Sequence, residues 1–235
     1  MTYFYELTIL PSQNRVLSEI LRIDSKLLVE REGEELKLLN ANGVINERKI
    51  HNFQFSLSLR RSVSYDPRIS IFCNKISSWG IYSFEPKAIR GYANVLPSSE
   101  LSRDGSNLPQ VLHTLLTTNR ETFRRIEDTL KMCLPEVDEI DLPVIRKDHQ
   151  PEVHIAIRER GFEKPFELAQ ISDGTLRLLA FITALNLDSP LVAFEKPENC
   201  VHPHLLETLI DIVRKSDKQV IISTHSPLLI RLLQT

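Results

Sequence analysis

Apolar and polar residues alternate along the first quarter of the chain, which is the pattern of strands with one buried face. In the opening run every second residue is apolar: Tyr3, Tyr5, Leu7 and Ile9. Three more short apolar runs follow, with Glu-Gly and Asn-Gly turn signals at 32–33 and 42–43. Residues 1–66 are therefore predicted to form an antiparallel meander with one face packed and the other solvated.

The middle of the chain changes to helical spacing. Apolar residues fall on one face of three segments, each of which is expected to form an amphipathic helix: 67–82, 107–117 and 120–132. Strand patterns return at 140–145 and 153–157. We expect residues 67–150 to form a small helical lobe.

The last third of the chain has the rhythm of an α/β unit. It shows helix, strand, helix, strand and helix in turn, at 176–187, 190–194, 203–215, 219–223 and from Pro227 onward. Both strands are continuous apolar runs, which is typical of parallel strands buried on both faces. Residues 151–235 are predicted to form a parallel sheet flanked by helices, which makes the chain an α/β protein with an added antiparallel sheet and helical lobe.

Composition narrows the class of protein without adding a function. The 235 residues are 42% hydrophobic and 26% charged, and the net charge of −2 gives no general attraction to nucleic acid or membranes. The three cysteines are far apart and form no Cys-x-x-Cys pair, which favours a reducing compartment. The sequence shows no signal peptide and no run long enough to span a membrane, so a cytoplasmic protein without a membrane partner is expected.

The first of three polar segments lies where phosphate chemistry is expected, at the start of a predicted helix. It consists of Ser172, Asp173, Gly174 and Thr175. Free amides, the helix dipole and a hydroxyl group can bind an anion at such a position. The alternative is an ordinary helix cap in a loop, and for this segment alone the alternative is the stronger interpretation, because Ser-Asp-Gly is common in turns.

The other two segments directly follow the two buried strands. Glu195 ends the first strand, and a carboxylate at this edge of a parallel sheet can hold Mg²⁺. His225 follows the second strand and can reach a phosphate or polarise an attacking water. The alternatives are an exposed polar turn for Glu195 and a helix-capping histidine for His225, and for a lone histidine the capping role is the better interpretation.

The order and spacing of the three segments favour function over these alternatives. Residues 168–230 resemble the C-terminal lobe of the ABC-type ATPase heads of SMC, RecF and OLD-like proteins. Three motifs carry the resemblance, namely Ser172-Asp-Gly174, Glu195-Lys196-Pro-Glu198-Asn199-Cys-Val-His202-Pro203 and Thr224-His225-Ser226-Pro227. A weaker resemblance, to the helical lobe of the same family, covers the segment from Asp104 to Leu112 and Leu134-Pro135.

The resemblance implies a partial P-loop NTPase fold of the ABC type, which binds ATP and Mg²⁺ between two heads. In the signature loop Ser172–Thr175, Ser172 and Gly174 would contact the γ-phosphate of ATP held by the partner head. Glu195 would be the Walker B acid that holds Mg²⁺ through water, and His225 would be the switch histidine. Two further residues, Glu198 and Asn199, would lie in the D-loop at the interface between heads.

The first departure from the family is the missing Walker A motif. A P-loop needs Gly-x-x-x-x-Gly-Lys-Ser/Thr to cradle the phosphates, yet no two of the seven glycines are five residues apart. A truncation, a shortened reading frame or one half of a split head would each account for this. We expect the chain alone to bind ATP poorly.

The second departure is Lys196, which stands where the resemblance places the catalytic glutamate. A lysine, with a reference pKa of about 10.4, is cationic at neutral pH and cannot serve as the base unless strongly perturbed. It can neutralise phosphate charge, so we expect binding without turnover. The alternative is that Glu198 or His225 replaces the missing base.

Three functions are compatible with these observations. The first is an ATPase head that dimerises on ATP, as a homodimer or with a P-loop-bearing partner head, and regulates DNA-associated or defence machinery. The second is a catalytically silent regulatory or scaffold subunit. The third is the ATPase fragment of an OLD-like nuclease. Apart from these, Cys200, His202 and His204 are crowded enough to suggest a metal site, but no fourth ligand is evident and the family pattern already accounts for His202.

Overall fold

The structure is a computed structural model that describes residues 1–10, 15–39, 45–49, 66–147, 149–199 and 202–234. Within it the chain forms two compact units, Met1–Ser77 and Ser78–Thr235. Each unit has its own buried core. The three-part division expected from the sequence, with boundaries after residues 66 and 150, stays a prediction.

The first unit is an antiparallel meander with one helix. Its strands follow one another in the sheet in chain order: β1 (Tyr3–Leu10), β2 (Arg15–Ile23), β3 (Lys26–Glu32), β4 (Glu35–Leu39) and β5 (Ile45–Lys49). Helix α2 (Pro67–Ser77) packs Ile69 and Phe72 into the same core as the sheet. The predicted meander is thereby confirmed, while the Asn-Gly turn at 42–43 and the end of the segment predicted to reach residue 66 lie outside the described residues.

The helix predicted over 67–82 is too long. Helix α2 ends at Ser77, and strand β6 (Gly80–Tyr82) takes the last residues of the predicted span. At Gly80 an added Cβ would lie 2.5 Å from the Tyr82 side chain, so a larger residue there would require the Tyr82 ring to move. Strand β6 pairs in parallel with β12 (Leu191–Glu195), a long-range pairing that local helical spacing cannot reveal.

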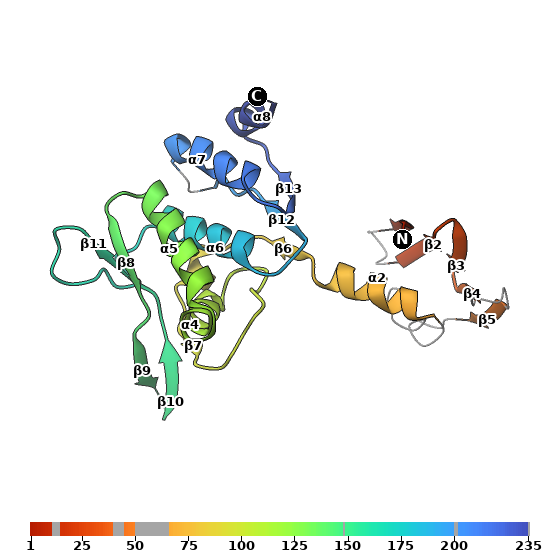
Figure 1. The fold of residues 1–235 in the computed structure, drawn as a ribbon, viewed down its shortest axis with the longest axis horizontal. Helices are drawn as coiled ribbons and strands as arrows, with labels where there is room; N and C mark the ends of the chain where they lie inside the picture. The colour runs from red at the N-terminus through yellow and green to blue at the C-terminus, as the bar shows by residue number, and fades with distance from the viewer. Residues whose placement is uncertain (11–14, 40–44, 50–65, 148, 200–201, 235) are drawn as a thin grey trace. The chain divides into compact units, whose positions relative to one another are not determined.

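The second unit is built around helix α6 (Asp173–Asn186), from which nine residues are buried. The helix runs through the middle of this unit (Figure 1). It packs against α5 (Arg120–Cys133), which follows α4 (Leu108–Thr118). On strand β12, Phe194 lies against Phe181 of α6, with ring centroids 4.2 Å apart. These contacts explain why α6 is apolar all round rather than on one face.

The parallel sheet of the second unit has the strand order β13-β12-β6, with β13 spanning Gln219–Ser223. Helix α7 (Pro203–Arg214) connects β12 to β13, and α8 (Pro227–Gln234) follows β13. The predicted succession of helices and strands from 176 onward is confirmed. In this region the sequence signal is strong because the strands are apolar throughout and helices α7 and α8 begin at prolines.

Among the described residues, one face of this sheet is covered far better than the other. Tyr82, Phe194 and Ile222 pack into the core. On the opposite face Ile81 and Ile221 flank Ala193 in register, and they are 57% and 50% exposed. The parallel sheet therefore presents an apolar row on its surface, contrary to the two-sided burial predicted for its strands.

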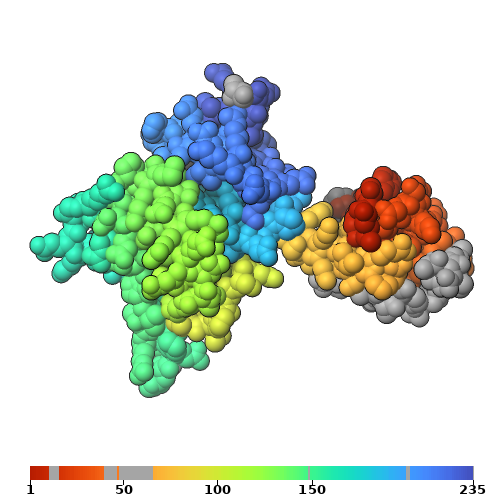
Figure 2. Space-filling view, in the orientation of Figure 1, coloured from red at the N-terminus to blue at the C-terminus, as the bar shows by residue number. Residues whose placement is uncertain are grey.

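Four short strands form a separate antiparallel region: β8 (Val137–Asp141), β9 (Val144–Lys147), β10 (Gln150–Val153) and β11 (Ala156–Glu159). The strands predicted at 140–145 and 153–157 are each split, because the chain passes from one small sheet to another at Leu142-Pro143 and at His154-Ile155. Strands β9 and β10 pair as a hairpin that extends from the body of the unit (Figure 2). Helix α3 (Pro86–Ile89) and strand β7 (Ala93–Asn94) complete the unit. No helix among the described residues is long and apolar enough to cross a membrane.

Candidate functional site

The loops after β12 and β13 lie side by side at the carboxyl edge of the parallel sheet. The two strands pair in parallel up to Glu195 and Ser223. One residue further on, the Lys196 amide donates a hydrogen bond of 2.8 Å to the Ser223 carbonyl. The second and third sequence motifs therefore meet at one edge, where open α/β sheets bind ligands.

Glu195 is half exposed at the end of β12. Its carboxylate lies 3.8 Å from the guanidinium of Arg103, and the two side chains are 50% and 72% exposed. A single exposed carboxylate at this edge fits the way Mg²⁺ is held, through one or two carboxylates, waters and phosphate oxygens. The nearby Arg103 is a cation that sequence reasoning missed, and it would compete with a metal ion for Glu195.

Arg103 reaches this position because its loop is fixed by short polar contacts. The Ser83 amide, just after β6, donates to the Arg103 carbonyl at 2.8 Å. Within the loop, Asp104 accepts a hydrogen bond of 3.0 Å from the Ser106 amide, which lowers the pKa of its carboxyl group below the usual value. Gly105 adopts a φ of +80°. Hydrogen bonds therefore fix the conformation of this loop.

Lys196 occupies an unusual backbone position. Its φ of +48° lies in the left-handed region, which few residues other than glycine adopt. The Asn199 amide closes the turn by donating to the Lys196 carbonyl at 3.1 Å. Left-handed conformations of this kind cost free energy and cluster at functional sites. The ammonium group is thus carried on a constrained turn directly beside Glu195.

Glu198 connects this turn with the loop that carries His225. Its Oε1 accepts a hydrogen bond of 2.5 Å from the Thr224 hydroxyl and a longer one, 3.4 Å, from the His225 amide. Its Oε2 is buried without a hydrogen-bond partner among the described residues. Glu198 is therefore engaged with the neighbouring loop, whereas the side chains of Asn199 and His225 are exposed.

The first motif forms the N-terminus of α6. Ser172 caps the helix: its hydroxyl oxygen accepts a hydrogen bond of 3.0 Å from the Thr175 amide and lies 2.8 Å from the Thr175 hydroxyl. Asp173 is the first helical residue, and Gly174 follows it. Ser172 thus has the role of a helix cap. The start of α6 is nevertheless accessible, because Ser172 and Asp173 are exposed.

Arg90 binds the loop before α6, and nothing in the sequence indicated this role. Its guanidinium donates to the carbonyls of Leu168 and Ile171 and to the Asp173 carboxylate, the last at 2.7 Å. The pairing neutralises a negative charge beside a helix start that would otherwise repel an anion. Since 83 residues separate Arg90 from Asp173, only the folded chain reveals the contact.

Helix α6, which begins with the first motif, carries a residue that lies near the second motif. Arg177, one turn into the helix, lines a small cavity together with Glu195 and Pro197. Its Nε atom is buried and has no hydrogen-bond partner within the described part of the chain. Tyr82, Phe84, Phe181 and Phe194 complete the lining. Within the described parts of the chain, no hydrogen bond joins Ser172 itself to the Glu195 or His225 loop, so the contact between motifs is made by the helix.

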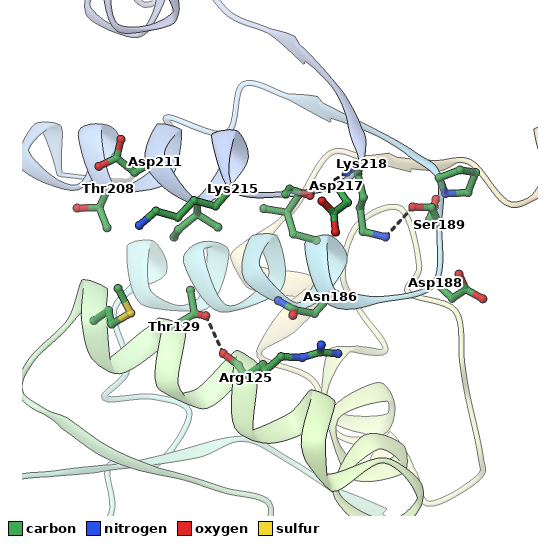
Figure 3. A pocket seen from close by; sticks show the side chains of 15 residues that line it. Arg125, Thr129, Asn186, Asp188, Ser189, Thr208, Asp211, Lys215, Asp217 and Lys218 are labelled. Carbon is green, nitrogen blue, oxygen red and sulfur yellow. Dashed lines mark hydrogen bonds between the residues drawn. The ribbon is translucent and has the colours of Figure 1, made fainter.

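A larger cleft, of about 620 Å³, lies away from these residues (Figure 3). It is lined by α5, the C-terminal ends of α6 and α7 and the residues before β12 and β13. Lys218 donates hydrogen bonds to the Leu187 and Ser189 carbonyls, and burial lowers the pKa of its ammonium group. The cleft sits at the amino edge of the sheet, opposite the predicted site. We assign the candidate site from the strand-end chemistry rather than from cleft size.

The alternative metal site is not supported by the residues that can be described. His202 caps α7, with its Nδ1 accepting a hydrogen bond of 3.3 Å from the His204 amide. Cys200 lies outside the described residues. Among the side chains that the structure does describe, no group of three or more His, Cys, Asp or Glu residues is arranged to hold a metal ion.

The chain is similar to one known protein family and to several solved structures. A family model described as "AAA domain, putative AbiEii toxin, Type IV TA system" matches residues 6–231. An SMC head bound to the C-terminal winged-helix domain of ScpA matches over 92% of this chain and 69% of its own, with 11% identity and a TM-score of 0.50. A comparison with curated proteins finds no match.

Two further structures match at lower TM-scores. The SMC head of Thermotoga maritima has 10% identity and a TM-score of 0.38, over 92% of this chain and 67% of its own. A dimeric ATP-binding cassette with bound ADP and phosphate has 13% identity and a TM-score of 0.40, over 93% of this chain and 67% of its own. At these identities the likeness concerns the fold alone.

Proposed function

We propose that this chain, which belongs to the AbiEii-like AAA-domain family, is the nucleotide-sandwiching half of an ABC-type ATPase head. The chain has an α/β fold of the SMC-head and ABC-ATPase kind. The observation that carries the proposal is the meeting of Glu195, Lys196, Glu198 and His225 at the carboxyl edge of one parallel sheet.

In this proposal the residues take the roles that the resemblance implies. Glu195 holds Mg²⁺ at the sheet edge, and His225 approaches the γ-phosphate. The start of α6 offers amides and the Ser172 hydroxyl to the phosphate of ATP that a partner head holds. When bound, Mg²⁺ would supply charge neutralisation of the phosphates. In this proposal the P-loop is supplied by residues other than these 235, which contain no Gly-x-x-x-x-Gly pair.

We further propose that hydrolysis by this half is impaired. Lys196 puts a cation where the resemblance places a general base, and a cationic ammonium cannot accept the proton of water. Glu198 is a poor substitute, since it already accepts the Thr224 hydroxyl at 2.5 Å. His225 remains as the other candidate base. Lys196 also favours a second function, that of a regulatory or scaffold subunit which binds nucleotide with its partner but does not turn it over.

The test is phosphate release by this chain mixed with the P-loop lobe of a family homologue, supplied as a separate polypeptide. We expect Lys196→Glu to raise turnover by about a hundredfold, the lower end of what a general base contributes. The matched control is Lys164→Glu, which makes the same charge change at an exposed loop position. Turnover by the unmodified chain at the rate of Lys196→Glu would contradict impaired hydrolysis.

A further inference from the structure

We infer that Glu198 is a positioning residue that fixes His225 from the neighbouring loop, so that the turn after β12 and the loop after β13 move as one piece. The inference rests on the proposed function for its catalytic meaning, because His225 acts on phosphate only if nucleotide binds at this edge. The geometry itself does not depend on nucleotide.

The first step of the argument is the strength of the contact. Hydrogen bonds to a carboxylate are shorter and about twice as strong as those between neutral groups. The bond from the Thr224 hydroxyl to Glu198 Oε1 is of this class, and the His225 amide donates to the same oxygen. Because Glu198 Oε2 is buried among the described residues, the carboxyl group is inserted between the loops rather than turned to solvent.

The second step is a series of hydrogen bonds that connects Thr224 with the rest of the His225 loop. The Thr224 hydroxyl oxygen accepts a hydrogen bond of 2.9 Å from the Ser226 amide. The Ser226 hydroxyl oxygen in turn accepts one of 3.3 Å from the Leu229 amide in the first turn of α8. The residues on both sides of His225 are therefore tied, directly or through Thr224, to one carboxylate, and the His225 amide adds a weaker bond at 3.4 Å.

The third step is the rigidity of the turn that carries Glu198. The Lys196 amide donates to the Ser223 carbonyl at 2.8 Å, and the Asn199 amide donates to the Lys196 carbonyl at 3.1 Å. The turn is thus closed on itself and joined to β13. A displacement of this turn, for instance by a partner molecule pressing on Asn199, would be transmitted through Glu198 to the backbone around His225.

The experiment measures amide hydrogen exchange by NMR in the full chain without nucleotide. We expect Glu198→Ala and Thr224→Val each to accelerate exchange at His225 and Ser226 by roughly tenfold, the effect of losing one hydrogen bond. Both variants should shift the imidazole signals of His225. The conservative variants Glu198→Gln and Thr224→Ser keep the acceptor and the hydroxyl and should stay near the unmodified chain.

The double variant Glu198→Ala/Thr224→Val separates positioning from general loosening. If the two groups act as one contact, adding Thr224→Val to Glu198→Ala gives no further acceleration at His225, whereas independent effects would multiply. Ser226 is not used for this comparison, because Thr224→Val also removes the acceptor of its own amide. Glu207→Ala, at an exposed position in α7, is the matched control and should change neither His225 nor Ser226.

The inference is overturned if exchange and imidazole signals are unchanged in Glu198→Ala, or if the two effects multiply. Should Glu198→Ala fail to fold, Thr224→Val decides alone, and unchanged exchange in that variant overturns the inference. Since no nucleotide is used, the positioning of His225 by Glu198 can be confirmed even where phosphate release fails, and that outcome would count against the proposed function only.

Discussion

At the scale of residues, two cations shape the candidate site in different ways. Arg90 neutralises Asp173 and holds the carbonyls before α6, so it keeps the helix start open to an anion. Lys196 adds positive charge beside Glu195 on a turn with a left-handed backbone. In the proposed function, Arg90 would prepare the helix start for a phosphate, and Lys196 would change what happens to that phosphate once it is bound.

Removing Arg90 should therefore loosen the start of α6. We expect Arg90→Ala to lower the free energy of unfolding by about 2 kcal/mol, the scale of a hydrogen bond to a charged group. Exchange at Ile171–Thr175 should rise with it. Arg90→Lys should recover only part of the loss, because one ammonium cannot match the geometry of the guanidinium fork. Chemical denaturation measures the change, and an effect no larger than that of Arg160→Ala, an exposed loop residue, would contradict it.

Such contacts also mark the limit of what the sequence can reveal. The ordered motifs predict roles for Glu195, Glu198 and His225 from strand ends and spacing, which are local properties of the chain, and these roles stay predictions. Arg90 and Arg103 were missed, since each is an ordinary surface arginine by sequence and gains its role only from contacts with residues about 80 or more positions away. The hydrogen bond between Thr224 and Glu198 depends on the register of strands β12 and β13, and this register cannot be read from the motif alone.

At the scale of elements, the predictions were reliable where periodicity ran long and failed where tertiary pairing intervened. Helices α4, α5, α6 and α7 lie within a few residues of the expected spans. The prediction that a helix continues to residue 82 was wrong, because residues 80–82 form strand β6, which is only three residues long and exists through its pairing with β12. The prediction that the parallel strands are buried on both faces was wrong as well, since Ile81 and Ile221 on either side of β12 are exposed.

Helix α2 offers a test of stability against pH. Asp66 accepts hydrogen bonds from the Arg68 guanidinium and the Arg68 amide, and the guanidinium contact lowers the pKa of the Asp66 carboxyl group. A lowered folded-state pKa means that the ionised form stabilises the fold, so the contribution is present above the ordinary value of 3.8 and is lost as pH falls through the lowered pKa.

Asp66→Ala is accordingly expected to cost about 1 kcal/mol at neutral pH, the usual cost of losing a helix cap. The difference from the unmodified chain should shrink as the pH falls below 3.8. Urea unfolding curves at a series of pH values measure it. A difference that stays constant down to the lowest pH would mean that the charge of Asp66 does not matter.

At the scale of the whole molecule, the chain unites a family fold with an incomplete set of nucleotide-binding parts. The family model covers both units, since it matches residues 6–231. The sequence supplies a signature-like loop, a strand-end acid and a switch-like histidine, but no P-loop spacing. Among the described residues, Ile81 and Ile221 on either side of Ala193 are also left exposed on one face of the parallel sheet. Binding of nucleotide should therefore depend on P-loop residues that are not among these 235.

Calorimetric titration with Mg·ATP tests this claim most directly. The chain alone should give no measurable binding, and an equimolar mixture with the P-loop lobe of a family homologue should bind Mg·ATP more tightly than that lobe does by itself. Ser172→Arg, which blocks the start of α6, should abolish the gain. Tight binding by the chain alone, or a mixture that binds no better than the lobe, would contradict the account.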